Sequence, residues 1–427
     1  MREMKETNVV WCPEIPHEWH IEKVKNNFDI SKDTSTVSNP TVLKLARSGI
    51  CIKDVTSNEG QMAESYDNYN KVIIGDLLLN PMDLYSGANC NVSEVEGVIS
   101  PAYVNLRAKK ELNSKYFDYY FKIQYWAMAM FAHGKGVSFD NRWTINAEGV
   151  KNYEIPIPTV DEQNNIVAVI DKKISQVDTL ISNQEKQIEK LKAYKQSLIT
   201  EVVTKGLDPT VPMKDSGAEE LGKVPEHWVI KRTKFIADSI IKGNGITKDE
   251  VLSDGDIQCI RYGEIYSKYE GSIEKTFSKT KISIIEKPQY IKKGNLLFAG
   301  TGELVEEIGK NIVYMGNESC LAGGDIIVLT HSQNPIFLNY ALYCISSQKQ
   351  KSKGKAKLKV VHISASEIGN IIVALPPLDE QNDIAKYLNI KCLQIDELIA
   401  IKQKKIEKLN QYKKSLIYEY VTGKKEA

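Results

Sequence analysis

One long segment of the chain occurs twice without a gap, and this repeat constrains the fold more than any other feature. Residues 157–204 align with residues 375–422, so that Asp161 corresponds to Asp379 and Thr204 to Thr422. Both copies contain the block Asp-Glu-Gln-Asn near their start and the block Ile-Glu-Lys-Leu near their centre. An ungapped repeat of this length, in a chain of mixed composition, indicates two copies of one structural element.

Each copy has the pattern of a long helix. It opens on a proline followed by Asp-Glu-Gln, which places acidic side chains in the first turn, where they suit the helix dipole. Apolar residues then recur at alternating steps of three and four, which is the seam of a coiled coil. The seam consists of Ile174, Val177, Ile181, Ile188, Leu191, Leu198 and Val202 in the first copy, and of Cys392, Ile395, Ile399, Ile406, Leu409, Leu416 and Tyr420 in the second.

Polar residues interrupt both seams at the same two places. Gln184 corresponds to Lys402, and Lys195 corresponds to Lys413. Independent surface helices have no reason to share interruptions, whereas two paired helices need them to match. We therefore expect the helices to pair with each other in one register, with Lys195 against Lys413.

The repeat extends into the segments that precede the helices. Residues 14–19 resemble residues 223–228, and shorter echoes follow in the same order, whereas the intervening stretches differ. Short β-branched and aromatic runs, with helical stretches at 112–131 and 336–350, indicate mixed α and β structure in both halves. We expect globular domains at 1–156 and 220–374, helical repeats at 157–206 and 375–427, and a turn-rich linker at 207–219. A shared framework with different loops indicates one kind of task performed on two targets.

Composition narrows the class of protein. The chain has 427 residues and a net charge of +1, so the overall charge does not indicate a nucleic-acid-binding protein. Its seven cysteines are scattered without a Cys-x-x-Cys pair, which argues for a reducing cytoplasm and against structural zinc or disulfides. No apolar run approaches the roughly 20 residues that span a membrane, and the N-terminus lacks the apolar core of a signal peptide.

Two stretches suggest enzyme chemistry, but neither has the complete motif. Asn80-Pro81-Met82 begins like the Asn-Pro-Pro-aromatic motif of amino-methyltransferases, but the second proline and the aromatic residue are missing. The glycine-containing stretch 300–311 has the wrong spacing for a phosphate-binding loop and has Asn311 where Ser or Thr would bind Mg²⁺. Histidines are dispersed, and no pairing of a nucleophile with a base is evident. We predict no catalytic residue and no metal site.

Two basic loops are the strongest candidates for ligand binding. Lysine occupies every second position from 349 to 359, which in an extended strand would align six ammonium groups on one face, suited to a phosphate backbone. A solvated flexible loop is the alternative. The corresponding stretch of the first half, 133–143, also contains glycines, cations and aromatic residues, and the loops 81–89 and 301–310 follow matched strands. The predicted DNA-binding residues are Lys135, Asn141, Arg142, Lys351, Lys353, Lys355, Lys357 and Lys359, of which Asn141 and Arg142 are suited to base edges.

The layout resembles the specificity subunit of type I restriction–modification enzymes over essentially the whole chain. The resemblance depends on the two helical repeats with Pro-Pro-Leu-Asp-Glu-Gln at 376–381 and Pro-Thr-Val-Asp-Glu-Gln at 158–163, on the tail blocks 195–199 and 413–417, and on 214–217 leading into 224–228. The first copy departs from the pattern at Thr159 and at 11–13. The resemblance implies an α+β fold: two mixed α/β target recognition domains in pseudo-twofold arrangement, separated by two long antiparallel coiled-coil helices.

The resemblance also implies function and partners. Each domain would read one half of a split site in double-stranded DNA, and the helices would act as a spacer and dock two modification subunits. This chain would bind no cofactor; S-adenosylmethionine would act on the modification subunits, with ATP and Mg²⁺ chemistry on partner subunits that include a motor-nuclease restriction subunit. The residues assigned to spacing and docking are Glu162, Gln163, Ile188, Leu191, Leu198, Glu380, Gln381, Ile406, Leu409 and Leu416. A protein-only oligomerisation scaffold and an orphan adenine methyltransferase using Asn80 remain the alternatives.

Overall fold

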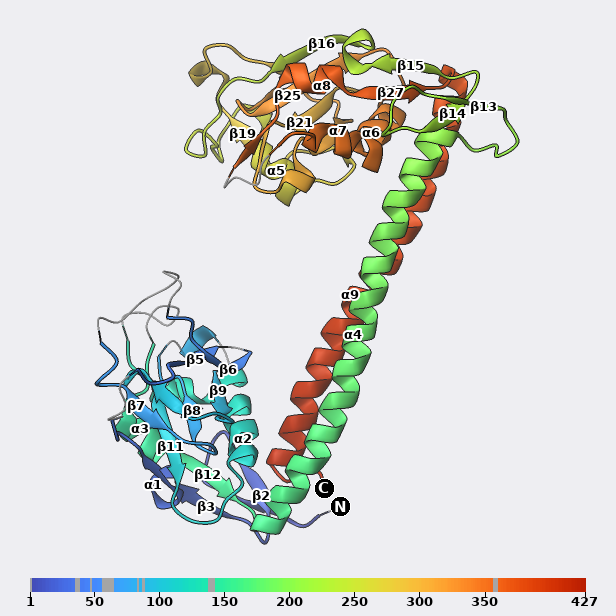
Figure 1. Ribbon diagram of the computed structural model, residues 1–427. Helices are drawn as coiled ribbons and strands as arrows, with labels where there is room; N and C mark the ends of the chain where they lie inside the picture. Colours follow the sequence, from blue (N-terminus) through green and yellow to red (C-terminus); the bar gives the residue numbers. More distant parts are fainter. Residues whose placement is uncertain are drawn as a thin grey trace. The chain divides into compact units, whose positions relative to one another are not determined.

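The structure is a computed structural model that describes residues 2–34, 39–46, 48–55, 65–82, 84–86, 89–136, 143–355 and 360–427. It divides into two compact units: unit 1 combines Met1–Gln184 with Gln403–Ala427, and unit 2 is Glu185–Lys402. Each unit has one globular domain and a part of each long helix, α4 (Val160–Lys205) and α9 (Leu378–Val421) (Figure 1). The two long helices predicted from the repeat are therefore confirmed.

The globular domain of unit 1 is built on a four-stranded antiparallel sheet. Its strand order is β4 (Phe28–Ile30), β11 (Val104–Ala108), β8 (Leu77–Leu79) and β9 (Cys90–Val92). Helix α2 (Ser114–Trp126) packs on β8 and β9. The remaining elements are the strand pairs β1 (Met4–Glu6) with β2 (Glu14–Pro16), β3 (His20–Lys23) with β12 (Glu154–Ile157), β5 (Leu43–Ala46) with β6 (Gly49–Ile52) and β7 (Asn70–Val72) with β10 (Gly97–Ile99), the helices α1 (Val24–Asn27) and α3 (Ala147–Asn152), and the 3-10 turns η1 (Leu84–Ser86) and η2 (Ala129–His133).

The globular domain of unit 2 has two sheets. One has the order β16 (Ala237–Lys242), β25 (Ile326–His331), β21 (Leu296–Ala299), β23 (Asn311–Tyr314) and β18 (Ser272–Ile273); the other has the order β19 (Ser278–Thr280), β17 (Ile257–Ile260), β24 (Cys320–Ala322) and β20 (Tyr290–Ile291). The remaining strands pair as β13 (Met213–Asp215) with β14 (Lys223–Pro225), β15 (Val229–Arg232) with β27 (Ile372–Leu375), and β22 (Thr301–Gly302) with β26 (Val361–His362). The helices are α5 (Tyr262–Ser267), α6 (Pro335–Tyr343), α7 (Ile345–Ser352) and α8 (Ala365–Asn370), and the 3-10 turns are η3 (Thr233–Phe235), η4 (Ile282–Ile284) and η5 (Val305–Glu307).

Short segments of similar sequence in the two halves form a central strand of each main sheet. In unit 1, Leu77 and Leu79 belong to one hydrophobic cluster and Leu78 to another, as alternate residues of a strand buried on both faces must. In unit 2, Leu296 and Leu297 of β21 divide between two clusters in the same way. A turn with a glycine of positive φ at its third position precedes each strand, with φ of 91° at Gly75 and 89° at Gly294.

Each globular domain packs on both long helices. In unit 1, the core cluster that contains the domain includes Ile166 and Ile170 of α4 together with Ile417 and Val421 of α9. In unit 2, the corresponding cluster includes Ile384 and Leu388 of α9 together with Ile199 and Val203 of α4. These two sets occupy equivalent positions of the repeat. Each domain is therefore held at the start of the helix that follows it and at the end of the other helix.

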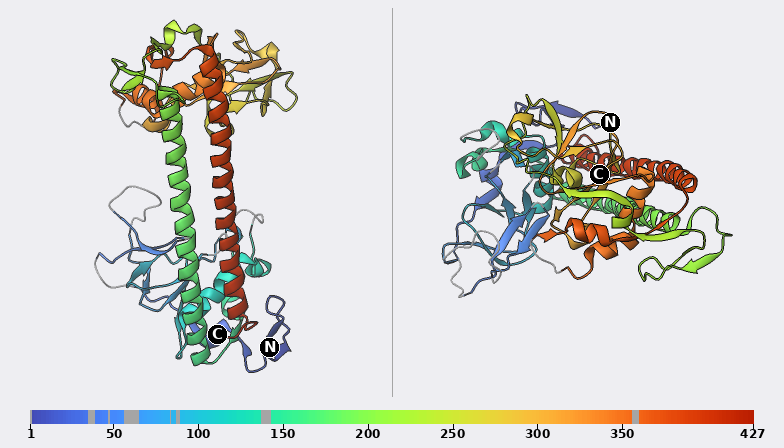
Figure 2. Two further views of the ribbon diagram at one scale, coloured as in Figure 1. Left: turned by 90° about the vertical axis from the view of Figure 1, so that its right-hand side faces the viewer. Right: turned by 90° about the horizontal axis from the view of Figure 1, so that it is seen from above.

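The two helices run antiparallel within each unit (Figures 1 and 2). In unit 2, Lys195 Nζ lies 2.7 Å from both carboxylate oxygens of Asp396, while Lys402 donates to Gln187. In unit 1, Lys413 Nζ donates to Asp178 Oδ1.

The expected contact between Lys195 and Lys413 is wrong. Antiparallel pairing places each of these lysines beside an aspartate of the other helix, and the two aspartates, Asp178 and Asp396, are themselves repeat equivalents. The matched interruptions are therefore two copies of one ion pair. Burial alone would lower the pKa of Lys195, but the hydrogen bond and charge of Asp396 outweigh it, and the net pKa is raised.

Candidate DNA interface

An indole–carboxylate contact anchors each domain to a long helix. In unit 1, Trp19 Nε1 donates to Glu162 Oε2 at 2.6 Å, and Arg2 donates to the other oxygen of the same carboxylate. In unit 2, Trp228 Nε1 lies 3.1 Å from both oxygens of Glu380. Both tryptophans are fully buried, so their N–H groups need these acceptors. The glutamate of the Asp-Glu-Gln-Asn block therefore fixes its domain on the first turn of the helix.

The next residue of the block completes the anchor. The Gln163 side chain accepts the Asn113 backbone N–H at 2.9 Å and donates to Pro158 O at 3.0 Å, and Gln381 repeats the same two contacts with Asn334 and Pro376. Both glutamines are buried, at 0% and 1% exposure. Their side chains therefore bond within the chain, and their assignment to spacing and subunit docking stays a prediction.

In unit 1, the loop after β8 lies against the basic loop predicted from the sequence. The backbone N–H of Leu84 donates to Trp143 O at 3.0 Å, and that of Ile145 donates to Pro81 O at 2.9 Å. Lys135 is exposed and forms a two-way backbone bridge with Thr144. The structure therefore brings two of the proposed target-facing loops together at one edge of the domain.

Unit 2 repeats this arrangement with different residues. The loop after β21 pairs with the segment that follows the second basic region, through β22 with β26 and through Ile363 N, which donates to Gly300 O at 2.9 Å. The Gln348 side chain adds a hydrogen bond to Ile308 O at 3.1 Å. Equivalent loops are thus paired in both units, although their sequences differ.

The predicted six-lysine strand is wrong in its first part. Residues 345–352 form α7, in which residues two apart point to nearly opposite sides, so Lys349 is exposed whereas Lys351 is buried. Lys351 is 2% exposed, and its ammonium donates at 2.8 Å to Gly309 O and to Asn311 Oδ1. Burial without a carboxylate partner lowers the pKa of Lys351 to about 7. Lys351 is therefore removed from the predicted DNA-contacting set.

Lys353 and Lys355 follow α7 and carry ion pairs on the protein surface. Lys353 Nζ lies 3.0 Å from Glu220, and Lys355 Nζ lies 2.7 Å from Glu367. The Lys353 side chain is exposed, so its ion pair is weak, on the order of 0–1 kcal/mol, and exchanges readily for a phosphate contact. The Lys355 side chain is only 12% exposed and also donates to His362 O at 2.6 Å. Four further predicted residues, Asn141, Arg142, Lys357 and Lys359, lie outside the described residues, so their DNA contacts stay predictions.

The predicted spacer residues lie along the paired helices. Ile188 and Leu416 are buried, and Leu191, Leu198, Ile406 and Leu409 are partly buried. This placement fits contact between the helices or with the domains.

Asn80 has a structural role in its loop. Its side-chain oxygen accepts the Met82 backbone N–H at 3.0 Å, and its backbone oxygen accepts the Tyr125 hydroxyl at 2.6 Å. Such a turn is typical of asparagine before a loop.

The described residues contain no cluster of three or more His, Cys, Asp or Glu side chains suited to a metal ion. Among the same residues, no helix is both long enough and apolar enough to cross a membrane.

Sequence reasoning missed residues whose role depends on contacts between distant segments. Arg107 donates through Nε and Nη2 to the buried Asp76 at 2.9 Å, and Asn105 donates to the same carboxylate. The Gly-Asp sequence at 75–76 gave no indication of this network. The pairing of Trp19 with Glu162 was equally hidden, although both residues stood in repeated motifs.

A known family matches a large part of this chain. The model of the family described as the type I restriction modification DNA specificity domain matches residues 225–411. The type I restriction enzyme MjaVIII specificity subunit of Methanocaldococcus jannaschii is 26% identical over 373 residues, which is 83% of this chain and 81% of the relative.

Two solved structures share the fold. A chain from a structure of complex assembly and conformational transition of the type I R-M system has a TM-score of 0.69 at 16% identity, covering 95% of this chain and 98% of its own. The HsdS subunit from Thermoanaerobacter tengcongensis has a TM-score of 0.50 at 17% identity, covering 96% and 98%.

Two domains with equivalent loop pairs stand on a shared helical frame, which is the arrangement expected of a protein that recognises two targets. The chain is thus similar over most of its length to the specificity subunits of type I restriction–modification enzymes, and its residues 225–411 match their DNA specificity domain. Its function is sequence-specific DNA recognition within such a complex, and the family is non-catalytic and binds no cofactor itself.

Proposed function

We propose that each globular domain binds one half of a split site in double-stranded DNA, through the paired loops at its edge. The supporting observation is that both units pair the loop after the central strand with the basic loop, on the same framework but with different sequences. Two such readers recognise two different half-sites. Lys135, Lys353 and Lys355, with the predicted Lys357 and Lys359, position phosphates, while Asn141 and Arg142 read base edges.

We further propose that the paired helices dock two modification subunits, one on each unit. In unit 1, Leu180 and Tyr412 are exposed by 47% and 51%; in unit 2, their repeat equivalents Leu398 and Tyr194 are exposed by 47% and 58%. Each leucine lies two residues from the aspartate of the interhelical ion pair, and each tyrosine lies next to the lysine. The ion pair therefore holds one leucine and one tyrosine at the same level of the helix pair in each unit.

Equivalent apolar side chains on two units favour two copies of the same partner. The modification subunits would supply S-adenosylmethionine chemistry, and restriction subunits would supply the chemistry that uses ATP and Mg²⁺. We place the complex in the cytoplasm, where cellular DNA lies.

DNA binding by the full chain, alone and with modification subunits, tests the proposal. We expect specific binding to a split site and transfer of methyl groups in the assembled complex. A protein-only scaffold would assemble with partners without any preference for a DNA sequence. Binding of S-adenosylmethionine by this chain alone would instead support the methyltransferase alternative.

Insertions test whether the helices set the gap between the half-sites. Four residues added after both Lys192 and Asn410 lengthen each helix by about 6 Å, and a four-residue insertion nearly completes a turn and roughly preserves the seam. We expect the gap in the methylated motif to grow by about one or two base pairs, at ~3.4 Å per pair, while the half-site sequences stay the same. An active variant with the original gap would show that the helices do not set the spacing.

A further inference from the structure

The loop after the central strand has an exposed apolar side chain at the same place in each unit. In unit 1, Tyr85 lies four residues after Pro81, and in unit 2, Leu304 lies four residues after Gly300. The carbonyl oxygens of Pro81 and Gly300 accept the backbone N–H groups of two isoleucines that occupy the same position in the two halves. The two apolar side chains are therefore equally far along the chain from equivalent anchors.

Both side chains are open to solvent. Tyr85 is 58% exposed and Leu304 is 54% exposed, and neither belongs to a hydrophobic cluster of the described residues. Single exposed apolar residues are ordinary on a protein surface. Here two of them occupy matching positions in loops whose sequences otherwise differ, which favours a shared use over chance.

Contacts within unit 1 hold the backbone around Tyr85 in place. Leu84, the preceding residue, is buried, and its backbone N–H donates to Trp143 O at 3.0 Å. At the start of the loop, the Tyr125 hydroxyl donates to Asn80 O at 2.6 Å. Because the backbone is already anchored, Tyr85 can contact a ligand without the cost of ordering the loop.

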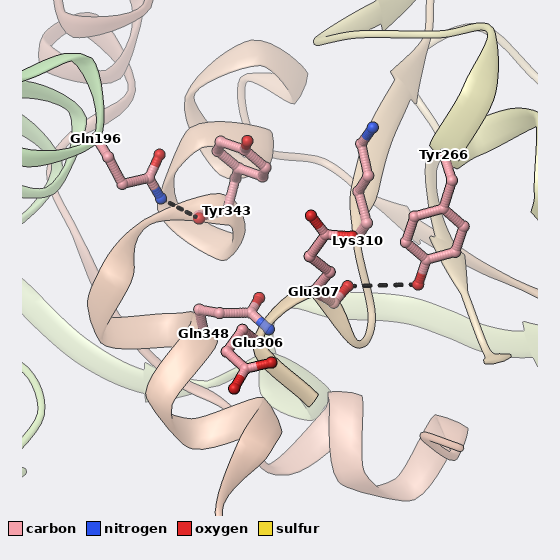
Figure 3. Close-up of a pocket in the computed structure, with 7 residues that line it drawn as sticks. All are labelled: Gln196, Tyr266, Glu306, Glu307, Lys310, Tyr343 and Gln348. Carbon is pink, nitrogen blue, oxygen red and sulfur yellow. Dashed lines mark hydrogen bonds between the residues drawn. The ribbon is translucent and has the colours of Figure 1, made fainter. Parts of the chain in front are cut away.

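The loop that carries Leu304 is anchored just as firmly in unit 2. Val305, the next residue, begins η5 and packs against the hydrophobic core of the unit. Further along the loop, the Tyr266 hydroxyl donates to Glu307 O at 3.3 Å, and the Gln348 side chain donates to the backbone oxygen of the following residue at 3.1 Å. Both contacts lie beside a cavity of about 220 Å³ (Figure 3). Leu304 is therefore also presented by a fixed backbone.

A lysine lies beside each of these loops. Lys135 is exposed and bonded through its backbone to Thr144, and Lys355 Nζ donates to His362 O at 2.6 Å. Thr144 and His362 occupy the same position in the two halves and directly precede the isoleucines that anchor the loops. Each loop thus has a cation near an exposed apolar group, and DNA offers phosphates to the first and bases to the second.

We propose that Tyr85 and Leu304 are specificity-determining residues, each of which contacts bases of one half-site through apolar surface. Leucine has no polar side-chain atom, so Leu304 selects a base by apolar contact, either with the C5-methyl group of thymine or by insertion between stacked bases. The ring of Tyr85 offers the same chemistry over a larger area. This inference rests on the proposed binding of DNA by the paired loops.

Alanine substitutions in the full-length chain, assembled with modification subunits, test both contacts. Tyr85→Ala and Leu304→Ala should each lower the ratio of specific to non-specific DNA binding by about tenfold, because losing a base contact resembles one mismatched base pair. The salt dependence of binding should stay the same, because no phosphate contact is removed. Tyr85→Phe should keep the wild-type ratio, because the ring supplies the contact.

Two matched controls remove apolar side chains of similar exposure at the opposite ends of the sheets. Ile74, 64% exposed, lies in the turn before β8, and Phe235, 70% exposed, precedes β16. The start of β16 pairs with the end of β25, whereas the loop after β21 leaves the sheet beside the start of β25. Ile74→Ala and Phe235→Ala should therefore leave the binding ratio unchanged.

The probes are duplexes with the motif that the wild-type complex methylates in cells, and the same duplexes with one or both half-sites scrambled. Tyr85→Ala should lose discrimination at one half-site and Leu304→Ala at the other, while thermal unfolding reports folding separately. Deoxyuridine in place of thymidine then separates the two forms of contact. It removes a contact with the thymine methyl group but leaves insertion between bases intact.

Full discrimination by either folded alanine variant would overturn the assignment of that residue. A weaker affinity for modification subunits, with discrimination between DNA sequences intact, would assign the two side chains to protein docking and also overturn the inference. Absence of any sequence preference in the wild-type complex would instead overturn the proposed function.

Discussion

Units 1 and 2 attach their domains to the helices in the same way but differ at the loops that face the target. The tryptophan–glutamate contact, the buried glutamine and the interhelical ion pair occur in both units with the same residue types. The paired loops occupy equivalent places in the two units. Unit 2 differs in having a four-stranded sheet beside its main five-stranded sheet, and a buried lysine, Lys351. The repeat therefore preserves attachment geometry, while the recognition loops are free to diverge.

The largest expected effect comes from breaking the indole anchors. Trp19→Ala and Trp228→Ala should each destabilise their own unit by about 3–5 kcal/mol, because a fully buried ring is removed. Phe at either position keeps most of the ring but leaves the glutamate without its N–H donor, at a cost of about 1–3 kcal/mol. Hydrogen exchange, resolved by segment, measures both effects. Destabilisation by only one of the two alanine variants would show that the anchors are not equivalent.

The next effect concerns the basic region of unit 2. Replacing Lys353, Lys355, Lys357 and Lys359 by Gln should weaken DNA binding for all sequences and flatten its salt dependence, by about 0.9 in the log–log slope for each phosphate interaction removed. Lys351→Gln is the internal control, because a buried ammonium does not reach a phosphate. Affinity is measured by titration at several salt concentrations. An unchanged slope in the fourfold variant would identify the region as a solvated loop.

The buried Lys351 should make the free energy of unfolding of unit 2, but not that of unit 1, depend on pH. Burial lowers its pKa to about 7, whereas an unfolded lysine titrates near 10.4. Between these values the unfolded state binds a proton that the folded state does not, so the free energy of unfolding rises with pH, by up to about 1.4 kcal/mol per unit. Lys351→Met should lose this increment between pH 7 and 9. Equal pH dependence of the urea midpoints in both proteins would contradict the assignment.

The smallest effect is expected at Asn80. Asn80→Ala removes one turn-stabilising hydrogen bond, worth about 1 kcal/mol, and should leave methyl transfer by the assembled complex largely intact. Rates of methyl transfer and DNA affinity are measured together. Loss of turnover at unchanged DNA affinity would mean that Asn80 takes part in the chemistry.

The sequence predicted the two long helices because repetition and periodicity are local signals. It could not predict which residues face each other across the chain. The resemblance implied antiparallel helices, but the expected contact set Lys195 against its own repeat equivalent Lys413. In the antiparallel pair each of these lysines meets an aspartate instead. Alternating lysines are equally compatible with a strand and with the end of a helix, and the packing of α7 decided the outcome for Lys351.

The central claim, two independent readers on one repeated frame, is tested most directly by a domain exchange. Residues 1–156 are replaced by the equivalent segment of a relative with a known methylated motif, which leaves the Glu162 side of the anchor and both helices in place. The methylated motif is then read from the DNA of cells that contain the hybrid complex. The account predicts that one half-site changes to that of the relative while the other half-site and the gap stay the same. A change in both half-sites, or in neither, from an active hybrid would contradict it.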